Sequence, residues 1–195
     1  VTHSDAANQA LLAAINNFGG LDILISNAGA AHAGPMLDIS NEELRNAFEL
    51  NFFSHYSFST EAAKILKDQN RGGQILFNIS KQAVNPGKNF GAYGLPKATT
   101  FFLMRQLALE LGSDGIRVNG INADRIRSGL LTDEFISSRA KSRGVSESEY
   151  MAGNLLNKEV TAEHVADAFT ALACAESTTG HVMTVDGGNI EASLR

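Results

Sequence analysis

Short apolar segments alternate with longer amphipathic segments along the whole chain, and this alternation is the feature that most constrains the fold. Such a pattern is typical of a mostly parallel sheet, because consecutive parallel strands need a crossover connection that is usually a helix. The expected strands are 21–26, 74–79, 116–121 and 181–185. The sequence therefore predicts an α/β fold with helices on both faces of a parallel sheet.

The amphipathic segments predict helices over 5–18, 40–67 and 93–111, and a last helix capped by Thr161. Ser40 and Glu43 have the spacing of a capping box. Pro96 is tolerated only in the first turn of a helix, where backbone N–H groups have no intrahelical acceptor, so the third helix must begin near Tyr93.

Segment 128–159 is less regular than the rest of the chain. It is charged and rich in serine, yet apolar residues such as Leu131, Tyr150 and Met151 are scattered through it. Long excursions of this kind inside a compact domain are more often functional than mere connections. We therefore expect a lid-like segment at 128–159 within a single domain that covers residues 1–195.

Composition excludes several classes of protein. The chain has 195 residues and a formal net charge of −5, without a long block of like charges, so a nucleic-acid partner is not expected. No apolar run approaches the roughly 18 residues of a membrane span. One cysteine, Cys174, excludes an intramolecular disulfide, offers no metal-ligand cluster and favours the cytoplasm.

Tyr93 and Lys97 stand four residues apart, so on a helix they share one face. An ammonium group beside a phenol lowers the pKa of the phenol from its usual value of about 10. A tyrosine of this kind can act as a general acid or base near neutral pH. The pair alone is weak evidence, because such spacings also arise by chance.

Three other places in the sequence each allow a functional and an ordinary interpretation. Asn51 interrupts an apolar helical stripe, so it is either a core amide bonded to backbone or part of a site. Ser80 follows a predicted strand, where open α/β sheets bind ligands, although a turn serine would also fit. The small residues Asn27, Ala28 and Gly29 follow an earlier strand and could let a ligand approach the backbone, or form a plain turn.

Together these groups are more specific than any one of them. Their order and spacing, closed by Thr179-Gly180 and Val185-Asp186-Gly187-Gly188, resemble the short-chain dehydrogenase/reductase family over essentially all 195 residues. The resemblance implies a Rossmann-like, doubly wound parallel sheet. It also implies an oxidoreductase that transfers hydride between NAD, or alternatively NADP, and a small carbonyl compound or alcohol.

The resemblance implies a role for each candidate residue. Tyr93 would exchange the proton, Ser80 would orient the substrate oxygen, and Asn51 would hold a water molecule in the proton relay. Lys97 would bind the nicotinamide ribose and lower the pKa of Tyr93. The expected cofactor-binding residues are Asn27, Ala28, Gly29, Tyr93, Lys97 and Ile126, and no metal is expected.

The glycine-rich pyrophosphate loop of the family is not found in this sequence. We therefore expect an N-terminally truncated domain that holds strands 4 to 7 of the family order, with an apolar edge at 21–26 that favours a homo-oligomer. We also expect this chain alone to be inactive and to bind NAD weakly.

The run from Ser80 to Lys97 resembles the dehydrogenase part of bifunctional rhamnulose-phosphate aldolase/alcohol dehydrogenases. This closer resemblance implies an aldolase domain in the parent protein, hydroxyaldehyde substrates of the lactaldehyde type and a place in carbohydrate metabolism. The alternative is a non-catalytic Rossmann-fold nucleotide sensor or oligomerisation module. The polar quartet Asn51, Ser80, Tyr93 and Lys97 favours the enzyme, since a scaffold does not need a lysine beside a tyrosine.

Overall fold

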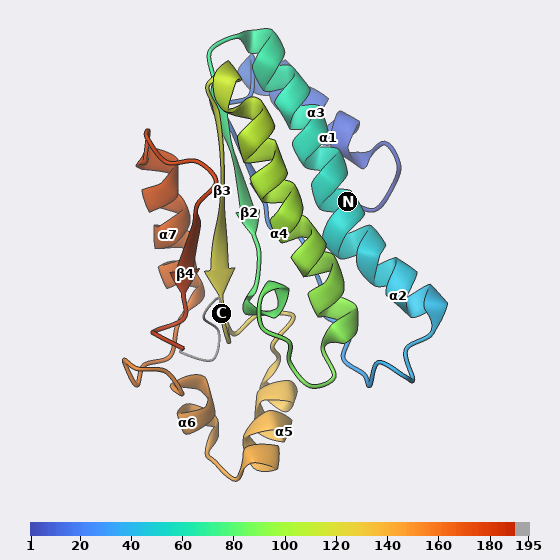
Figure 1. The fold of residues 1–195 in the computed structure, drawn as a ribbon, viewed down its shortest axis with the longest axis vertical. Helices are drawn as coiled ribbons and strands as arrows, with labels where there is room; N and C mark the ends of the chain where they lie inside the picture. The colour runs from blue at the N-terminus through green and yellow to red at the C-terminus, as the bar shows by residue number, and fades with distance from the viewer. Residues whose placement is uncertain (190–195) are drawn as a thin grey trace.

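Four parallel strands form one sheet in the computed structural model, which describes residues 1–189 (Figure 1). They pair in the order β1-β2-β3-β4, with Ile23 opposite Gln74, Gly73 opposite Ile116 and Gly120 opposite Val182. The predicted parallel sheet is confirmed, and each strand end lies within two residues of its predicted place. The strands are β1 (Ile23–Ser26), β2 (Gly73–Asn78), β3 (Ile116–Ala123) and β4 (Val182–Val185).

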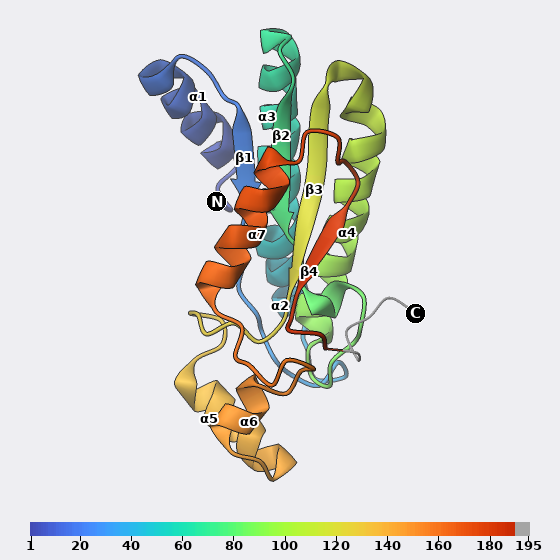
Figure 2. The same ribbon diagram turned by 90° about the vertical axis from the view of Figure 1, so that its left-hand side faces the viewer.

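Helices cover both faces of this sheet, as Figure 2 shows for α7 on one side and α3 and α4 on the other. Side chains of β2 alternate between the two faces: Ile75 and Phe77 pack with Met104 of α4, whereas Leu76 packs with Phe169 of α7. The helices are α1 (Ala6–Phe18), α2 (Asn41–Phe48), α3 (Ser54–Gln69), α4 (Gly91–Leu111), α5 (Asp133–Arg143), α6 (Glu147–Met151) and α7 (Ala162–Cys174). Within residues 1–189, no helix has the length and apolar character needed to cross a bilayer.

The helix expected over 40–67 is confirmed as a continuous helical segment over 41–69, with one irregularity that was not predicted. The capping box of Ser40 and Glu43 opens α2 as predicted, but a π-helical segment, Glu49–Phe53, separates α2 from α3. Asn51 lies in this segment, and its backbone carbonyl accepts a hydrogen bond of 2.7 Å from the Thr100 hydroxyl of α4. The sequence did not predict this π-helical segment, in which the Asn51 carbonyl has a partner on another helix. Single π-helical turns of this kind are frequent at functional sites.

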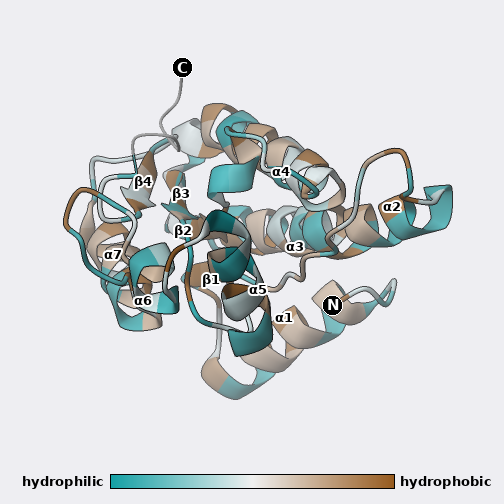
Figure 3. Ribbon diagram, turned by 90° about the horizontal axis from the view of Figure 1, so that it is seen from below, coloured by the Kyte–Doolittle hydropathy of each residue, from teal (hydrophilic) through white to brown (hydrophobic). Residues whose placement is uncertain are grey.

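Segment 128–159 is more regular than expected, since it contains α5 and α6. The side chains of Thr132 and Ser146 cap these two helices. Both helices lie beyond the carboxyl ends of the strands, and Figure 3 shows them from that side with mostly hydrophilic outer turns. Their own small apolar cluster consists of Leu131, Ile136, Ala140, Tyr150 and Met151.

Strand β1 is an edge of the sheet within the described residues. Its side chains Ile23 and Ile25 are 44% and 52% exposed, so the expected apolar edge is confirmed. The helix α4 begins at Gly91, which places Pro96 near its start, as the proline requires.

Candidate functional site

Two cavities meet at Tyr93, at the carboxyl end of the sheet. The first, of about 690 Å³, is lined by Ser80, Tyr93 and residues of α5 and α6. The second, of about 520 Å³, is lined by five of the expected cofactor-binding residues: Asn27, Gly29, Tyr93, Lys97 and Ile126. Ala28 and Asn51 line neither cavity. Tyr93 therefore lies between a space on the Ser80 side and a space on the Lys97 side.

Tyr93 lies in the first turn of α4 and is largely buried. Burial raises the pKa of its hydroxyl, and this effect outweighs a hydrogen bond with Ser80 that lowers the pKa. The expectation that Lys97 lowers the pKa of Tyr93 is wrong for this structure. The Lys97 ammonium lies 5.8 Å from the centre of the phenol ring, and its charge is not among the causes of the shift.

Lys97 has its ammonium group inside the protein, with only 2% of the side chain exposed. Its Nζ donates a hydrogen bond of 2.9 Å to the backbone carbonyl of Asn78. Loss of water around the charge lowers the pKa of Lys97 to about 8. The remaining N–H donors of this ammonium are available to a ligand in the second cavity.

Asn51 is a core amide whose side chain bonds to backbone, the ordinary interpretation of this residue. Its Nδ2 donates to the carbonyls of Ala30 (2.9 Å) and Ala47 (3.1 Å), and its Oδ1 accepts from the N–H of Ala30 at 3.3 Å. A Cβ on Gly29 would lie 2.8 Å from this Oδ1 and 3.6 Å from Nζ of Lys97. The Asn51 side chain therefore anchors the 27–30 loop through its hydrogen bonds to Ala30. A residue larger than glycine at position 29 would clash with this side chain.

The sequence did not single out His55, which is almost fully buried on α3. Its Nδ1 lies 2.6 Å from the Ser26 hydroxyl at the end of β1. Burial first, and then the charge of Lys97, lower the pKa of His55 to about 3. The imidazole is therefore neutral at physiological pH and supports the strand end from which the 27–30 loop begins.

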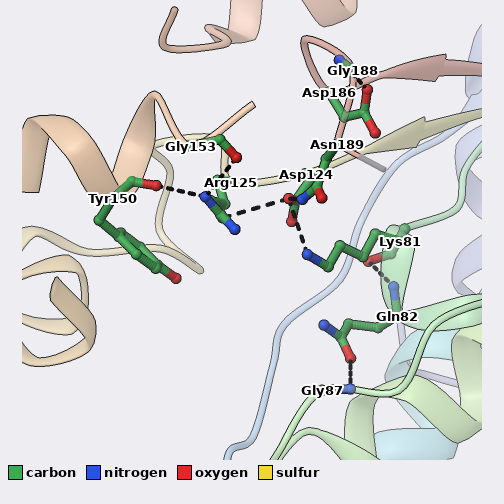
Figure 4. A network of polar contacts seen from close by, with 11 residues as sticks. Lys81, Gln82, Gly87, Asp124, Arg125, Tyr150, Gly153, Asp186, Gly188 and Asn189 are labelled. Carbon is green, nitrogen blue, oxygen red and sulfur yellow. Dashed lines mark hydrogen bonds and ion pairs between the residues drawn. The ribbon is translucent and has the colours of Figure 1, made fainter. Parts of the chain in front are cut away.

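Asp124, directly after β3, is the centre of a polar network that the sequence did not reveal (Figure 4). Its carboxylate lies 3.2 Å from Nζ of Lys81, 3.5 Å from Nε of Arg125, and accepts a hydrogen bond of 2.6 Å from Asn189. Lys81 adjoins Ser80, so this network fixes the backbone next to the candidate substrate-binding serine.

Arg125 connects this network to α6. Its guanidinium donates to the backbone carbonyls of Tyr150 (2.7 Å) and Gly153 (3.3 Å), as Figure 4 shows. Its φ of 53° lies in the left-handed region, which residues other than glycine seldom adopt outside functional or strained positions. The 128–159 segment is thus attached to the carboxyl end of β3.

Comparison with known proteins agrees with this geometry. The family model described as enoyl-(acyl carrier protein) reductase matches residues 1–189. The chain is 35% identical to the uncharacterized oxidoreductase YuxG of Bacillus subtilis over 196 aligned positions, 96% of this chain and 28% of that protein. It is 32% identical to the 7alpha-hydroxysteroid dehydrogenase of Escherichia coli, over 91% of this chain and 67% of that enzyme.

Among solved structures, the carveol dehydrogenase of Mycobacterium avium in complex with NAD has the same fold. Its TM-score is 0.89 at 21% identity, over 97% of this chain and 72% of that one. The chain thus spans little more than a quarter of the Bacillus protein and about two thirds to three quarters of the other two. From the match of the family model over 1–189 and the placement of Ser80, Tyr93 and Lys97, the chain belongs to the short-chain dehydrogenase/reductase family of oxidoreductases.

Proposed function

We propose that the protein transfers hydride between a nicotinamide dinucleotide and a small carbonyl compound or alcohol, with Tyr93 as its general acid and base. The position of Tyr93 where the two cavities meet, with Ser80 on the lining of the first cavity, is the observation that carries this proposal. A substrate oxygen in the first cavity and a cofactor in the second would then meet at the Tyr93 hydroxyl.

The second cavity suits the cofactor. Gly29 exposes backbone there, and the Lys97 ammonium has N–H donors to offer to ribose hydroxyls. NAD is the proposed cofactor, supported by the NAD complex of the carveol dehydrogenase, with NADP as the alternative. Bound in this place, the nicotinamide supplies or accepts the hydride. Asn27 and Ile126 would contact it from the loop walls.

The protein's own residues handle the proton and the substrate oxygen. The Tyr93 hydroxyl would donate its proton to a carbonyl oxygen during reduction and take the proton from an alcohol during oxidation. The Ser80 hydroxyl would hold the same oxygen in place. The Lys97 ammonium, 5.8 Å from the centre of the phenol ring, would hold the cofactor ribose beside Tyr93.

Asn51 takes an indirect role in this proposal. Asn51 holds Ala30 through its amide, and so keeps Gly29 at the wall of the second cavity. A water molecule beside Asn51 would continue the proton path from Lys97, as the family resemblance implies. Segment 128–159 would act as the lid over the first cavity, which it lines with residues of α5 and α6.

Lactaldehyde-type hydroxyaldehydes are the proposed substrates, and an aldolase domain in the same protein is the proposed source, within carbohydrate metabolism in the cytoplasm. The resemblance of the 80–97 run supports this choice. The match to only 28% of the Bacillus protein is compatible with a second domain in that relative. A homo-oligomer is proposed as well, supported by the exposed Leu95, Phe102 and Leu109 along α4.

The test is a turnover assay on the full-length protein with NAD or NADP and a panel of small alcohols and hydroxyaldehydes that includes lactaldehyde. The absorbance of the reduced nicotinamide reports hydride transfer directly. The proposal expects turnover that depends on the cofactor. Dinucleotide binding without turnover of any compound in the panel would instead indicate the non-catalytic nucleotide sensor.

A further inference from the structure

We infer that the substrate carries an anionic group, a carboxylate or a phosphate, and that Arg139 binds it in the first cavity. This inference rests on the proposed function, which places the reacting carbonyl or alcohol group of the substrate at Tyr93. The anionic group is inferred separately, from other residues that line the same cavity. It would make the preferred substrate a phosphorylated hydroxyaldehyde, or a hydroxy or oxo acid, in place of the neutral lactaldehyde.

Positive charge is in excess on the lining of this cavity. Asp124 is its one carboxylate among the described residues, and the ion pairs with Lys81 and Arg125 already engage that carboxylate. The cationic side chains that line the cavity are Lys81, Lys88, Arg125, Arg139 and Arg143. A cavity with such a charge imbalance attracts anions.

Arg139 is held in place without an anionic partner. Its guanidinium lies 5.5 Å from the centre of the Phe90 ring and 5.7 Å from that of Phe135. These two rings contact each other edge to face. Contacts with aromatic rings fix a guanidinium but leave its N–H fork open for a bidentate ligand.

The Nε of Arg139 is buried and has no hydrogen-bond partner in the part of the chain that the structure describes. No ion pair of Arg139 or Arg143 with a carboxylate occurs within residues 1–189 either. An unpaired donor inside a protein costs free energy, so its persistence beside a cavity points to a ligand that pairs with it. Carboxylate and phosphate oxygens are the acceptors that an arginine fork fits best.

The spacing of the two arginines on α5 supports the same ligand. Arg139 and Arg143 are four residues apart, and both line the cavity. Like charges at this spacing destabilise a helix. The acidic residues of α5, Asp133 and Glu134, lie in its first turn, and Asp133 already pairs with Arg127. An anion bound between the helix and the sheet would compensate the repulsion.

The experiment compares substrates with and without an anionic group, again on the full-length protein. The pairs are 3-hydroxybutyrate with its methyl ester, and glyceraldehyde 3-phosphate with glyceraldehyde. Arg139→Met retains a long side chain against the two rings but removes the positive charge and the paired N–H donors of the guanidinium. Arg139→Lys retains the charge alone. Arg105→Met is the matched control, because Arg105 also packs on a phenyl ring, that of Phe101 at 5.9 Å, but lines no part of this cavity.

We expect a higher kcat/KM for the charged member of at least one pair. Arg139→Met should lower that value by about 10- to 100-fold, the loss typical of a charged hydrogen bond, and leave the neutral member within about twofold. Arg139→Lys should lie between, and Arg105→Met should match the parent. A second readout is independent of turnover: calorimetry should show that glycerol 3-phosphate binds more tightly than glycerol, and that Arg139→Met removes the difference.

The two proposals fail in different ways. Turnover of the neutral compounds, with no preference for charge and no effect of either Arg139 variant, would overturn the anion site and uphold the oxidoreductase. Binding of glycerol 3-phosphate that depends on Arg139, without turnover of any compound, would uphold the anion site and overturn the oxidoreductase. If Arg139→Met does not fold, Arg139→Lys and Arg105→Met still decide the first question.

Discussion

The ammonium group of Lys97 donates a hydrogen bond of 2.9 Å to the backbone carbonyl of Asn78, the last residue of β2. This bond joins the first turns of α4, which carry Tyr93, to the carboxyl end of the sheet. The charge lies almost fully out of water, and this loss of hydration lowers the pKa of Lys97 to about 8. Burial of this charged group therefore lowers the stability of the folded protein, and the dependence of stability on pH should show this cost.

Lys97→Met should remove a pH dependence of stability. Between about pH 8 and the unfolded value of 10.5, the unfolded chain binds a proton at Lys97 that the folded chain does not bind. The free energy of unfolding of the parent should therefore rise with pH in this window, relative to the variant, by at most about 1.4 kcal/mol per unit. Denaturant titrations of both proteins at several pH values measure the difference, and a difference that stays constant would contradict the lowered pKa.

His55→Gln should change the acid side of the same profile. The pKa of His55 is about 3 in the folded protein, against 6.5 for a free imidazole. As pH falls from about 6.5 towards 3, the unfolded chain takes up this proton and the folded chain does not, so the parent loses stability. The variant should lose less over this range. His3→Gln, an exposed position, serves as the control and should follow the parent.

Gly29→Ala should be far more damaging than Gly112→Ala. A Cβ at position 29 would approach Oδ1 of Asn51 to 2.8 Å, so the loop or the amide must move, and the second cavity with it. A Cβ at position 112, on a backbone with helical φ, meets nothing within 4 Å. We expect Gly29→Ala to lower dinucleotide affinity and the melting temperature, whereas Gly112→Ala should leave both unchanged or slightly raise stability. Equal effects of the two changes would refute this role of Gly29.

Ser80→Ala should reduce turnover much more than Lys81→Ala. Ser80 and Tyr93 line the same cavity, and loss of a donor at a reacting oxygen typically costs about 100- to 1,000-fold in kcat. Lys81 contacts Asp124 instead, and without Lys81 that carboxylate keeps Arg125 and Asn189. We expect Lys81→Ala to stay within about tenfold of the parent. Steady-state kinetics that gave the reverse order would show that the substrate-orienting serine is misassigned.

The fold could be predicted because its signals are local. Each strand is a short apolar run, and capping residues such as Ser40 can be recognised in the sequence. The helix α6 was missed although Ser146 and Glu149 form a capping box that could have revealed it. The π-helical segment around Asn51 was not predicted from the sequence, and the partner of the Asn51 carbonyl, Thr100, lies 49 residues away.

The candidate site could be predicted only in part, for the same reason. The order and spacing of Ser80, Tyr93 and Lys97 indicate a common site. The structure brings all three to one end of the sheet. The pKa of Tyr93 was predicted in the wrong direction, since burial by distant elements decides it. Arg139 was not singled out either: Phe135 lies one turn earlier on the same helix, but the second ring partner, Phe90, and the cavity come from other segments of the chain.

Tyr93→Phe tests the central proposal most directly, with Tyr56→Phe on the outer face of α3 as its control. Both changes remove one phenol oxygen, but only Tyr93 lies where the two cavities meet. The measurement is kcat for cofactor-dependent turnover by the full-length protein, with dinucleotide affinity and melting temperature recorded for each variant. We predict that Tyr93→Phe lowers kcat by about 100- to 10,000-fold with little change in the fold, while Tyr56→Phe matches the parent. A Tyr93→Phe variant that kept more than about a tenth of the parental kcat would contradict the acid–base role of Tyr93.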